Sequence, residues 1–317
     1  MKTRNKIRYY IIAILAAIVL MVISTSMIRA QQDPQYSQYM FNMMSVNPAY
    51  TGTRDAMNIL LLSRLQWVGL DGAPRSHTLA LHTPIREKKI GLGASVISDN
   101  IGPVKSTYIN LNYAYRLKLT ETLTLSAGLK AGINNYDVNL TGLELNESDP
   151  SFGQDYTRNF QPNFGVGFYL YSNQYYAGFS IPKLLKESSW NSGSPDQGFV
   201  SVKRHFFLTA GYVFELNSDW KFKPSLLNKI VEGAPPSLDV TAQVLYRDRF
   251  WLGTTYRIGD AIAILFEMQV NKQVTVGYAY DITVSQMRKI SNGSHEILVS
   301  YDFTGYTNDR VKSPRYF

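Results

Sequence analysis

The chain has 317 residues, with 32 Lys and Arg against 24 Asp and Glu, and it has no cysteine. The lack of cysteine excludes disulfide scaffolds, thiolate metal sites and cysteine nucleophiles. Five of the 32 basic residues lie in the first 30 positions, which leaves 27 against 24 acidic residues, and these 27 form no run of the kind that binds nucleic acid.

Residues 1–30 have the layout of a signal peptide. Four basic residues among the first eight positions precede an apolar run from Ile11 to about Ile28, and the small residue Ala30 follows. This layout predicts export and cleavage after Ala30. The apolar run is about 18 residues long, so an uncleaved membrane anchor is the alternative.

The next stretch, residues 31–55, is neither an amphipathic helix nor a regular strand. Tyrosines, methionines and a phenylalanine lie among small polar residues, and the Asn-Pro pair sets a turn. Each large apolar side chain left in water would cost about 1.5 to 3 kcal/mol relative to burial, so we expect the stretch to pack against something. It is a tail packed on its own domain, a plug, or an arm that binds a partner. The candidate residues are Tyr36, Tyr39, Phe41, Met43, Met44, Asn47 and Pro48.

From Ala56 onward the sequence alternates with a period of two. In residues 236–247 and 261–271, apolar side chains at even positions alternate with mostly polar or small ones at odd positions, which gives a strand two different faces. About fourteen such runs follow one another, and many reach the ten residues that a tilted strand needs to cross a membrane. The sequence therefore predicts an all-β fold, a transmembrane antiparallel β-barrel of about fourteen strands over residues 56–306, with a tail over 307–317. A soluble β-sandwich, which predicts shorter strands, is the alternative.

Short and long connections take turns between the predicted strands. Tight turns are expected at 85–88, 120–121, 172–173, 217–218, 248–249 and 272, and longer connections at 67–74, 99–104, 140–159, 186–202, 230–235 and 283–293, with 259–260 breaking the pattern. Outer-membrane barrels place short turns and both termini in the periplasm and long loops at the cell surface. We expect that orientation here, with residues 31–55 plugging or capping the periplasmic end.

The two faces of the strands have different expected surroundings. Aromatic residues near strand ends, such as Tyr169, Tyr176 and Trp251, are predicted to lie at the lipid headgroup level. The polar faces would line the lumen, where glycines such as Gly91 and Gly128 would let another segment approach the wall.

No active site is predicted. The four histidines match no metal-ligand spacing, and neighbouring residues Ser294 and His295 would face opposite sides of a strand. We therefore expect no catalytic residue, no cofactor and no metal, with an outer-membrane hydrolase as the alternative.

Several motifs resemble one known family. DPQYSQYMFN over residues 33–42, NPAYTG over 47–52, RLQWVGLDGAP over 64–74 and the closing SPRYF are similar to the PorP/SprF family, outer-membrane proteins of the type IX secretion and gliding-motility apparatus of Bacteroidetes. Trp67 and Asp71 in the third motif are further candidates for partner binding. Without the family, that motif is a Gly/Asp/Pro turn with an interfacial tryptophan.

The resemblance implies a non-enzymatic integral protein of the outer membrane. Such a protein would assist type IX secretion by binding and anchoring or displaying a secreted cell-surface adhesin through the adhesin's C-terminal domain. The implied partners are that adhesin, the type IX translocon, periplasmic ring and motor components, and outer-membrane lipid, with no nucleic acid. The alternative is a diffusion channel or hydrophobic-solute transporter, which needs no protein partner.

Overall fold

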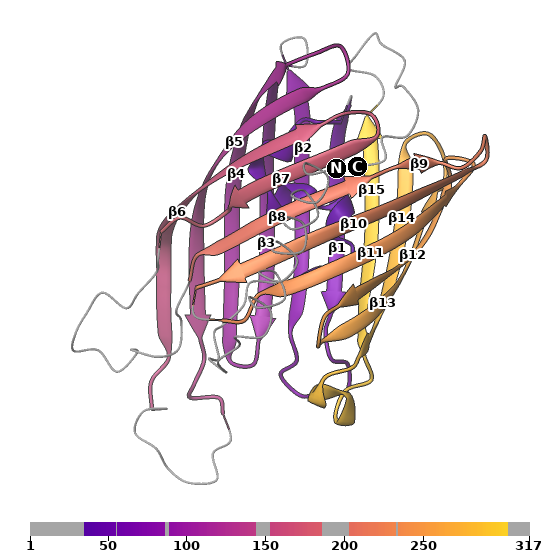
Figure 1. Cartoon of the computed structure of the whole chain (residues 1–317). Helices are drawn as coiled ribbons and strands as arrows, with labels where there is room; N and C mark the ends of the chain where they lie inside the picture. Colours follow the sequence, from indigo (N-terminus) through magenta and orange to yellow (C-terminus); the bar gives the residue numbers. More distant parts are fainter. Residues whose placement is uncertain are drawn as a thin grey trace, which may run out of the picture.

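A computed structural model describes residues 35–54, 56–85, 89–143, 153–185, 203–232 and 234–303. Most of the described chain is antiparallel β-structure, and the strands tilt around a closed wall (Figure 1). The strands are β1 (Met57–Leu65), β2 (Arg75–Ile85), β3 (Ile90–Ile101), β4 (Val104–Lys118), β5 (Thr124–Val138), β6 (Tyr156–Tyr171), β7 (Tyr175–Ile181), β8 (His205–Tyr212), β9 (Phe214–Glu215), β10 (Trp220–Val231), β11 (Ser237–Tyr246), β12 (Phe250–Arg257), β13 (Ala261–Gln269), β14 (Val274–Thr283) and β15 (Ser294–Phe303). The expected signal peptide and C-terminal tail lie outside the described residues.

The wall closes because the first and last strands pair with each other. Each strand pairs with its neighbours in sequence, and β1 pairs with β15 from Met57 opposite Phe303 onward. The short β9 continues β8 beyond Val213, since both pair with β10 in one register. Counting β8 and β9 together, the wall has fourteen strands, which confirms the predicted barrel.

The barrel is inverted relative to a soluble protein, with apolar side chains outside and polar ones inside. On β13, Ile264 and Phe266 point outward with 50% and 41% of their surface exposed, whereas Glu267 points inward and is 7% exposed. An apolar exterior of this kind is stable only against lipid. The closed sheet and its outer face therefore exclude the soluble β-sandwich.

Among the described residues, no helix is both long and apolar enough to cross a membrane.

The two ends of the barrel differ in their connections. One end, the turn end, carries the short connections 119–123, 172–174, 216–219, 247–249 and 270–273. The other end, the loop end, carries the connections 66–74 and 284–293, and the described residues 139–143, 153–155, 182–185 and 203–204 lie there too. This end is at the bottom of Figure 1. The expected long connection over 99–104 is wrong: β3 and β4 stay paired up to Ile101 and Val104, and Gly102 closes a tight turn with a φ of 54°.

Candidate functional site

Residues 35–54, the lumen segment, lie inside the barrel. They form three short turns, the 3-10 helix η1 (Tyr39–Phe41), the helix α2 (Met43–Val46) and the 3-10 helix η2 (Pro48–Tyr50), drawn in indigo in Figure 1. The Asn47 side chain accepts a hydrogen bond from the Ala49 amide at 2.9 Å, so it caps η2 ahead of Pro48. All residues of the segment are buried except Gln35, Phe41, Ser45 and Arg54.

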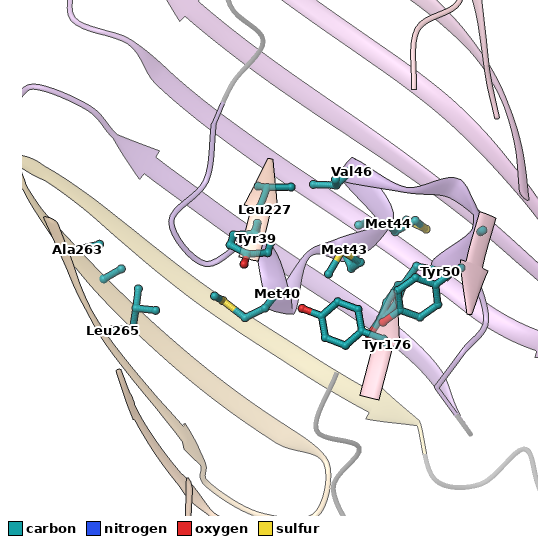
Figure 2. Packing of buried hydrophobic residues seen from close by; sticks show 14 residues of the cluster. Tyr39, Met40, Met43, Met44, Val46, Tyr50, Tyr176, Leu227, Ala263 and Leu265 are labelled. Atoms are coloured by element: carbon teal, nitrogen blue, oxygen red, sulfur yellow. The ribbon is translucent and has the colours of Figure 1, made fainter. Parts of the chain in front are cut away.

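The apolar side chains of the lumen segment reach different strands. In Figure 2, Met40 points toward Ala263 and Leu265 of β13, and Tyr50 lies beside Tyr176 of β7. Met43 and Met44 belong to the same buried cluster, with 0% and 3% of their surface exposed. Because the segment brings its own apolar side chains, this part of the lumen is a packed core.

The wall contributes aromatic residues to that core, which corrects one prediction. Tyr169 and Trp251 are 1% and 7% exposed, so they do not lie at the headgroup level as expected, and neither does the buried Tyr176. The Tyr169 ring packs edge-on against Tyr50 at a centroid distance of 5.7 Å, and the Trp251 ring packs against Phe41 at 6.3 Å. Edge-to-face pairs of this kind add roughly 0.5 to 1.5 kcal/mol beyond burial.

Glycines of the wall let the backbone of the lumen segment approach. A Cβ atom on Gly91 would lie closer than 3.0 Å to the Thr51 backbone, and one on Gly128 would lie that close to the Ala49 backbone. A Cβ on Gly167 would collide with the Asn47 side chain in the same way. The inward glycines of β3, β5 and β6 therefore act as predicted, since a larger residue would occupy the space of the segment.

Polar wall groups bind the backbone of the segment. Ser126 donates to the Ala49 carbonyl at 2.6 Å, and Ser180 donates to the Val46 carbonyl at 2.8 Å. In the same way, the His82 ring accepts a hydrogen bond from the Gly52 amide, and Arg116 donates to the Gly52 carbonyl. In the reverse direction, the Asn47 side chain of the segment donates to the Phe168 carbonyl of β6. The buried backbone is thus paired by the wall, as a stable buried segment requires.

A buried ion network binds the start of the segment. Glu296 on β15 accepts hydrogen bonds from the amides of Ser37 and Gln38 at 2.6 and 3.0 Å. Arg64 on β1 pairs with Glu296, and it also pairs with Asp281 on β14 at 2.8 Å. The Ser37 hydroxyl donates to Asp281 at 2.8 Å. These charges are costly to bury alone, so each depends on the others and on the segment.

The lumen segment runs from the loop end to the turn end. Ser37 meets Glu296 and Asp281, which lie close to the loop-end termini of their strands. Arg54 pairs with Asp302 at 3.1 Å, next to the turn-end terminus of β15. The segment therefore extends along the lumen, whereas the sequence suggested a plug or cap at one end.

Trp67 and Asp71 do not join this site. Both lie in the loop-end connection 66–74, where Trp67 is half-buried with a φ of 50° and its amide donates to the Ser294 hydroxyl at 3.1 Å. Asp71 is exposed. The other predicted residues, Tyr36, Tyr39, Phe41, Met43, Met44, Asn47 and Pro48, all lie in the lumen.

Asp281 and Glu296 lie on the polar strand faces that were predicted to line the lumen, but the sequence did not predict that they would bind the lumen segment. Sequence reasoning also missed Tyr169 and Trp251 as lumen residues. The alternation of the strands could have identified them. Tyr169 lies two positions from the inward Gly167 and therefore on the same face of β6, and Trp251 has the same relation to Gly253 on β12.

Within the described residues, no group of three or more His, Cys, Asp and Glu side chains could hold a metal ion.

At the loop end, the amides of Thr141 and Leu140 donate to Asp155 at 2.9 and 2.8 Å. The hydrogen bond from Thr141 is the main reason that the pKa of the Asp155 carboxyl lies below its ordinary value. The contacts between the lumen segment and the wall, described above, are apolar packing and hydrogen bonds to the segment's backbone.

Solved structures with low identity align over most of the chain. The Acinetobacter baumannii outer membrane protein Omp33 is 8% identical, and 100% of its chain aligns with 80% of this one at a TM-score of 0.48. The CymD monoaromatic hydrocarbon channel is 12% identical, with 93% of its chain aligned to 84% of this one at a TM-score of 0.49. No curated protein matches the chain.

A family model described as "Type IX secretion system membrane protein PorP/SprF" matches residues 28–301. This range takes in the lumen segment and nearly the whole wall. The match and the closed barrel together make this an integral outer-membrane protein that associates with type IX secretion components. The chain belongs to the PorP/SprF family.

Proposed function

We propose that this barrel is a non-enzymatic scaffold of type IX secretion that binds and anchors a secreted cell-surface adhesin through the adhesin's C-terminal domain. The observation that carries the proposal is the lumen segment, which lies along the interior and packs against the wall. A lumen occupied by the protein's own chain suits a protein that presents surfaces to partners more than one that passes solutes.

The loop end offers a stiff surface for such a partner. We call the two connections 66–74 and 284–293 the loop platform. Two backbone hydrogen bonds join them, from the Val68 amide to the Gly293 carbonyl and from the Asn292 amide to the Val68 carbonyl, both at 2.8 Å. The platform exposes Asp71 and the apolar Ile290, which has 56% of its surface exposed. Preorganised surface loops of this kind commonly carry binding.

In this proposal the loop end faces the cell surface and the adhesin. The turn end faces the periplasm, where the translocon and the ring and motor components of the type IX system would meet the tight turns.

Adhesin display tests the proposal. We expect Ile290→Asp to reduce adhesin on the cell surface and its co-purification with the barrel at least several-fold, because a buried interface disfavours an unpaired charge. Ser218→Asp, an exposed change at the turn end, is the matched control for cargo binding. Normal display in cells that lack the barrel altogether would refute the scaffold function.

A bilayer experiment separates the scaffold from the alternative, a diffusion channel or hydrophobic-solute transporter. The wild-type barrel is expected to give no steady conductance after reconstitution, and a variant without residues 36–53 to conduct. Steady conductance by the wild-type protein, equal to that of the deletion, would favour the channel.

A further inference from the structure

The outer face of β2, β3 and β4 changes from apolar to polar toward the loop end. Three exposed residues, here called the apolar row, lie opposite one another where these strands pair: Leu79, Val96 and Ile109. Two further outward rows lie between the apolar row and the loop end. All of their side chains can donate hydrogen bonds, and we call them the donor patch: His77, Ser98 and Thr107 in the first row, and Arg75, Asn100 and Lys105 in the second.

The spacing of these rows brings the donor side chains together on one surface. Residues two apart on a strand face the same side and are separated by about 7 Å, so each row lies one such step nearer the loop end. Arg75 and Lys105 are separated by one strand, which carries Asn100, and their backbones are therefore about 10 Å apart. Side chains of this length can reach one ligand above Asn100.

The two basic residues of the donor patch are exposed and open to an anion. Within the described part of the chain, neither Arg75 nor Lys105 forms an ion pair. The exposed Asp137 on β5 lies opposite Lys105 at the edge of the patch, and the exposed Asp71 lies in the connection before β2. Asp99, between the two donor rows of β3, is buried on the inner face. The outer surface around Arg75 thus presents positive charge and neutral donors.

The donor patch occupies one side of the barrel. On β2, the His77 Nδ1 atom lies 2.9 Å from the Ser63 hydroxyl of β1, and this hydrogen bond orients the ring beside the patch. On the side formed by β12, β13 and β14, the wall stays apolar up to the loop end, where Ile258, Ile282 and Val284 are exposed. The polar rows are therefore a local feature of β2–β4.

A lipid fits the position of the donor patch. The apolar row belongs to the outer surface of the barrel, which contacts lipid tails. The donor rows continue the same surface toward the loop end, so they lie beside the headgroups of those lipids. An arginine and a lysine next to hydroxyl and amide donors match a phosphate, because the guanidinium fork and the ammonium both form charge-assisted hydrogen bonds with its oxygens.

We propose that the donor patch binds the phosphate of a lipid headgroup in the surrounding leaflet. Arg75 and Lys105 hold the phosphate oxygens, Ser98 and Thr107 bind the polar part of the headgroup beneath them, and the acyl chains lie along the apolar row. In the orientation proposed above, this leaflet faces the cell surface and the lipid is a phosphorylated glycolipid. The site does not depend on adhesin binding, because it faces sideways into the membrane.

Binding measured by microscale thermophoresis on the purified full-length barrel in a neutral detergent tests the site. The probes are diphosphoryl lipid A, the same lipid without its phosphates, and inorganic phosphate. We expect the phosphorylated lipid to bind roughly tenfold more tightly than the dephosphorylated one, and salt to weaken its binding by screening the exposed charges. An excess of inorganic phosphate should not displace the lipid, because it makes no contact with the apolar row. Equal binding of the two lipids, or displacement by inorganic phosphate, would overturn the proposal.

Variants locate the binding on the wall. The double change Arg75→Gln and Lys105→Gln should weaken binding of the phosphorylated lipid roughly tenfold or more, and both side chains are exposed, so the fold should tolerate it. The matched control, Arg288→Gln with Lys289→Gln, removes the same two charges from an exposed part of the connection 284–293 at the same end. Asp137→Asn should tighten binding, since it removes the carboxylate opposite Lys105. Unchanged binding in the first variant, or an equal loss in the control, would refute the assignment.

Discussion

Gly128 on β5 marks how little room separates the wall from the lumen segment. A valine there would drive its side chain into the Pro48 and Ala49 backbone, so we expect Gly128→Val to lower the free energy of unfolding by about 1 to 3 kcal/mol and to expose residues 35–54 to protease. Ala127→Val, which adds a side chain of the same size on the outer face, is the control. Denaturant unfolding in detergent and limited proteolysis measure both effects. Equal stability of the two variants would contradict this packing.

Glu296 is the residue on which the buried ion network depends. Glu296→Gln removes the carboxylate that binds Arg64 and the Ser37 amide, and it leaves Arg64 with less compensation. We expect a loss of about 3 to 5 kcal/mol in the free energy of unfolding. Asp260→Asn breaks a partly exposed pair with Arg257 and should cost at most about 1 kcal/mol. A loss for Glu296→Gln no larger than this control would mean that the network does not stabilise the barrel.

At this scale the sequence predicts which face a residue occupies more readily than what surrounds it. The alternation of polar and apolar residues places Glu296 and Asp281 inside the barrel, but it does not predict which strands lie opposite each other across the lumen. An aromatic residue near a strand end suits both a lipid interface and a packed lumen. For Tyr169, only its position on the same strand face as the inward Gly167 distinguishes a packed lumen from a lipid interface.

Along each strand, depth in the membrane sets the cost of a charge on the outer face. Phe266 lies near the middle of β13, whereas Ile258 lies in the turn before it, and both are exposed. We expect Phe266→Arg to lower the free energy of unfolding in lipid bilayers by about 2 to 4 kcal/mol and Ile258→Arg by about 0 to 1 kcal/mol. Equal costs at the two positions would place the membrane elsewhere on the barrel.

The strands were predictable because lipid outside and polar groups inside impose the same alternation on each of them. The connection over 99–104 was not predictable in the same way. Its sequence is rich in residues that favour turns, although β3 and β4 stay paired up to Ile101 and Val104. The short turns η1, α2 and η2 have no period of their own. Their shape comes from the wall glycines and serines that surround them, which are distant in sequence.

The orientation of the whole molecule is open to a labelling test, because the chain has no cysteine of its own. Gln154→Cys at the loop end should react with a membrane-impermeant maleimide on intact cells. Ser218→Cys at the turn end should react only after the outer membrane is permeabilised. Labelling of Ser218→Cys on intact cells would show that the barrel has the opposite orientation in the membrane.

The seam between β1 and β15 has a consequence for biogenesis. It joins the first and last strands, so it can form only after the entire chain has been delivered to the membrane. Residues 35–54 are synthesised before any strand, and they contact both sides of the seam, β1 through Ser37 and Arg64 and β15 through Arg54 and Asp302. The wall is therefore expected to assemble around the segment as a template, with ring closure as the last step.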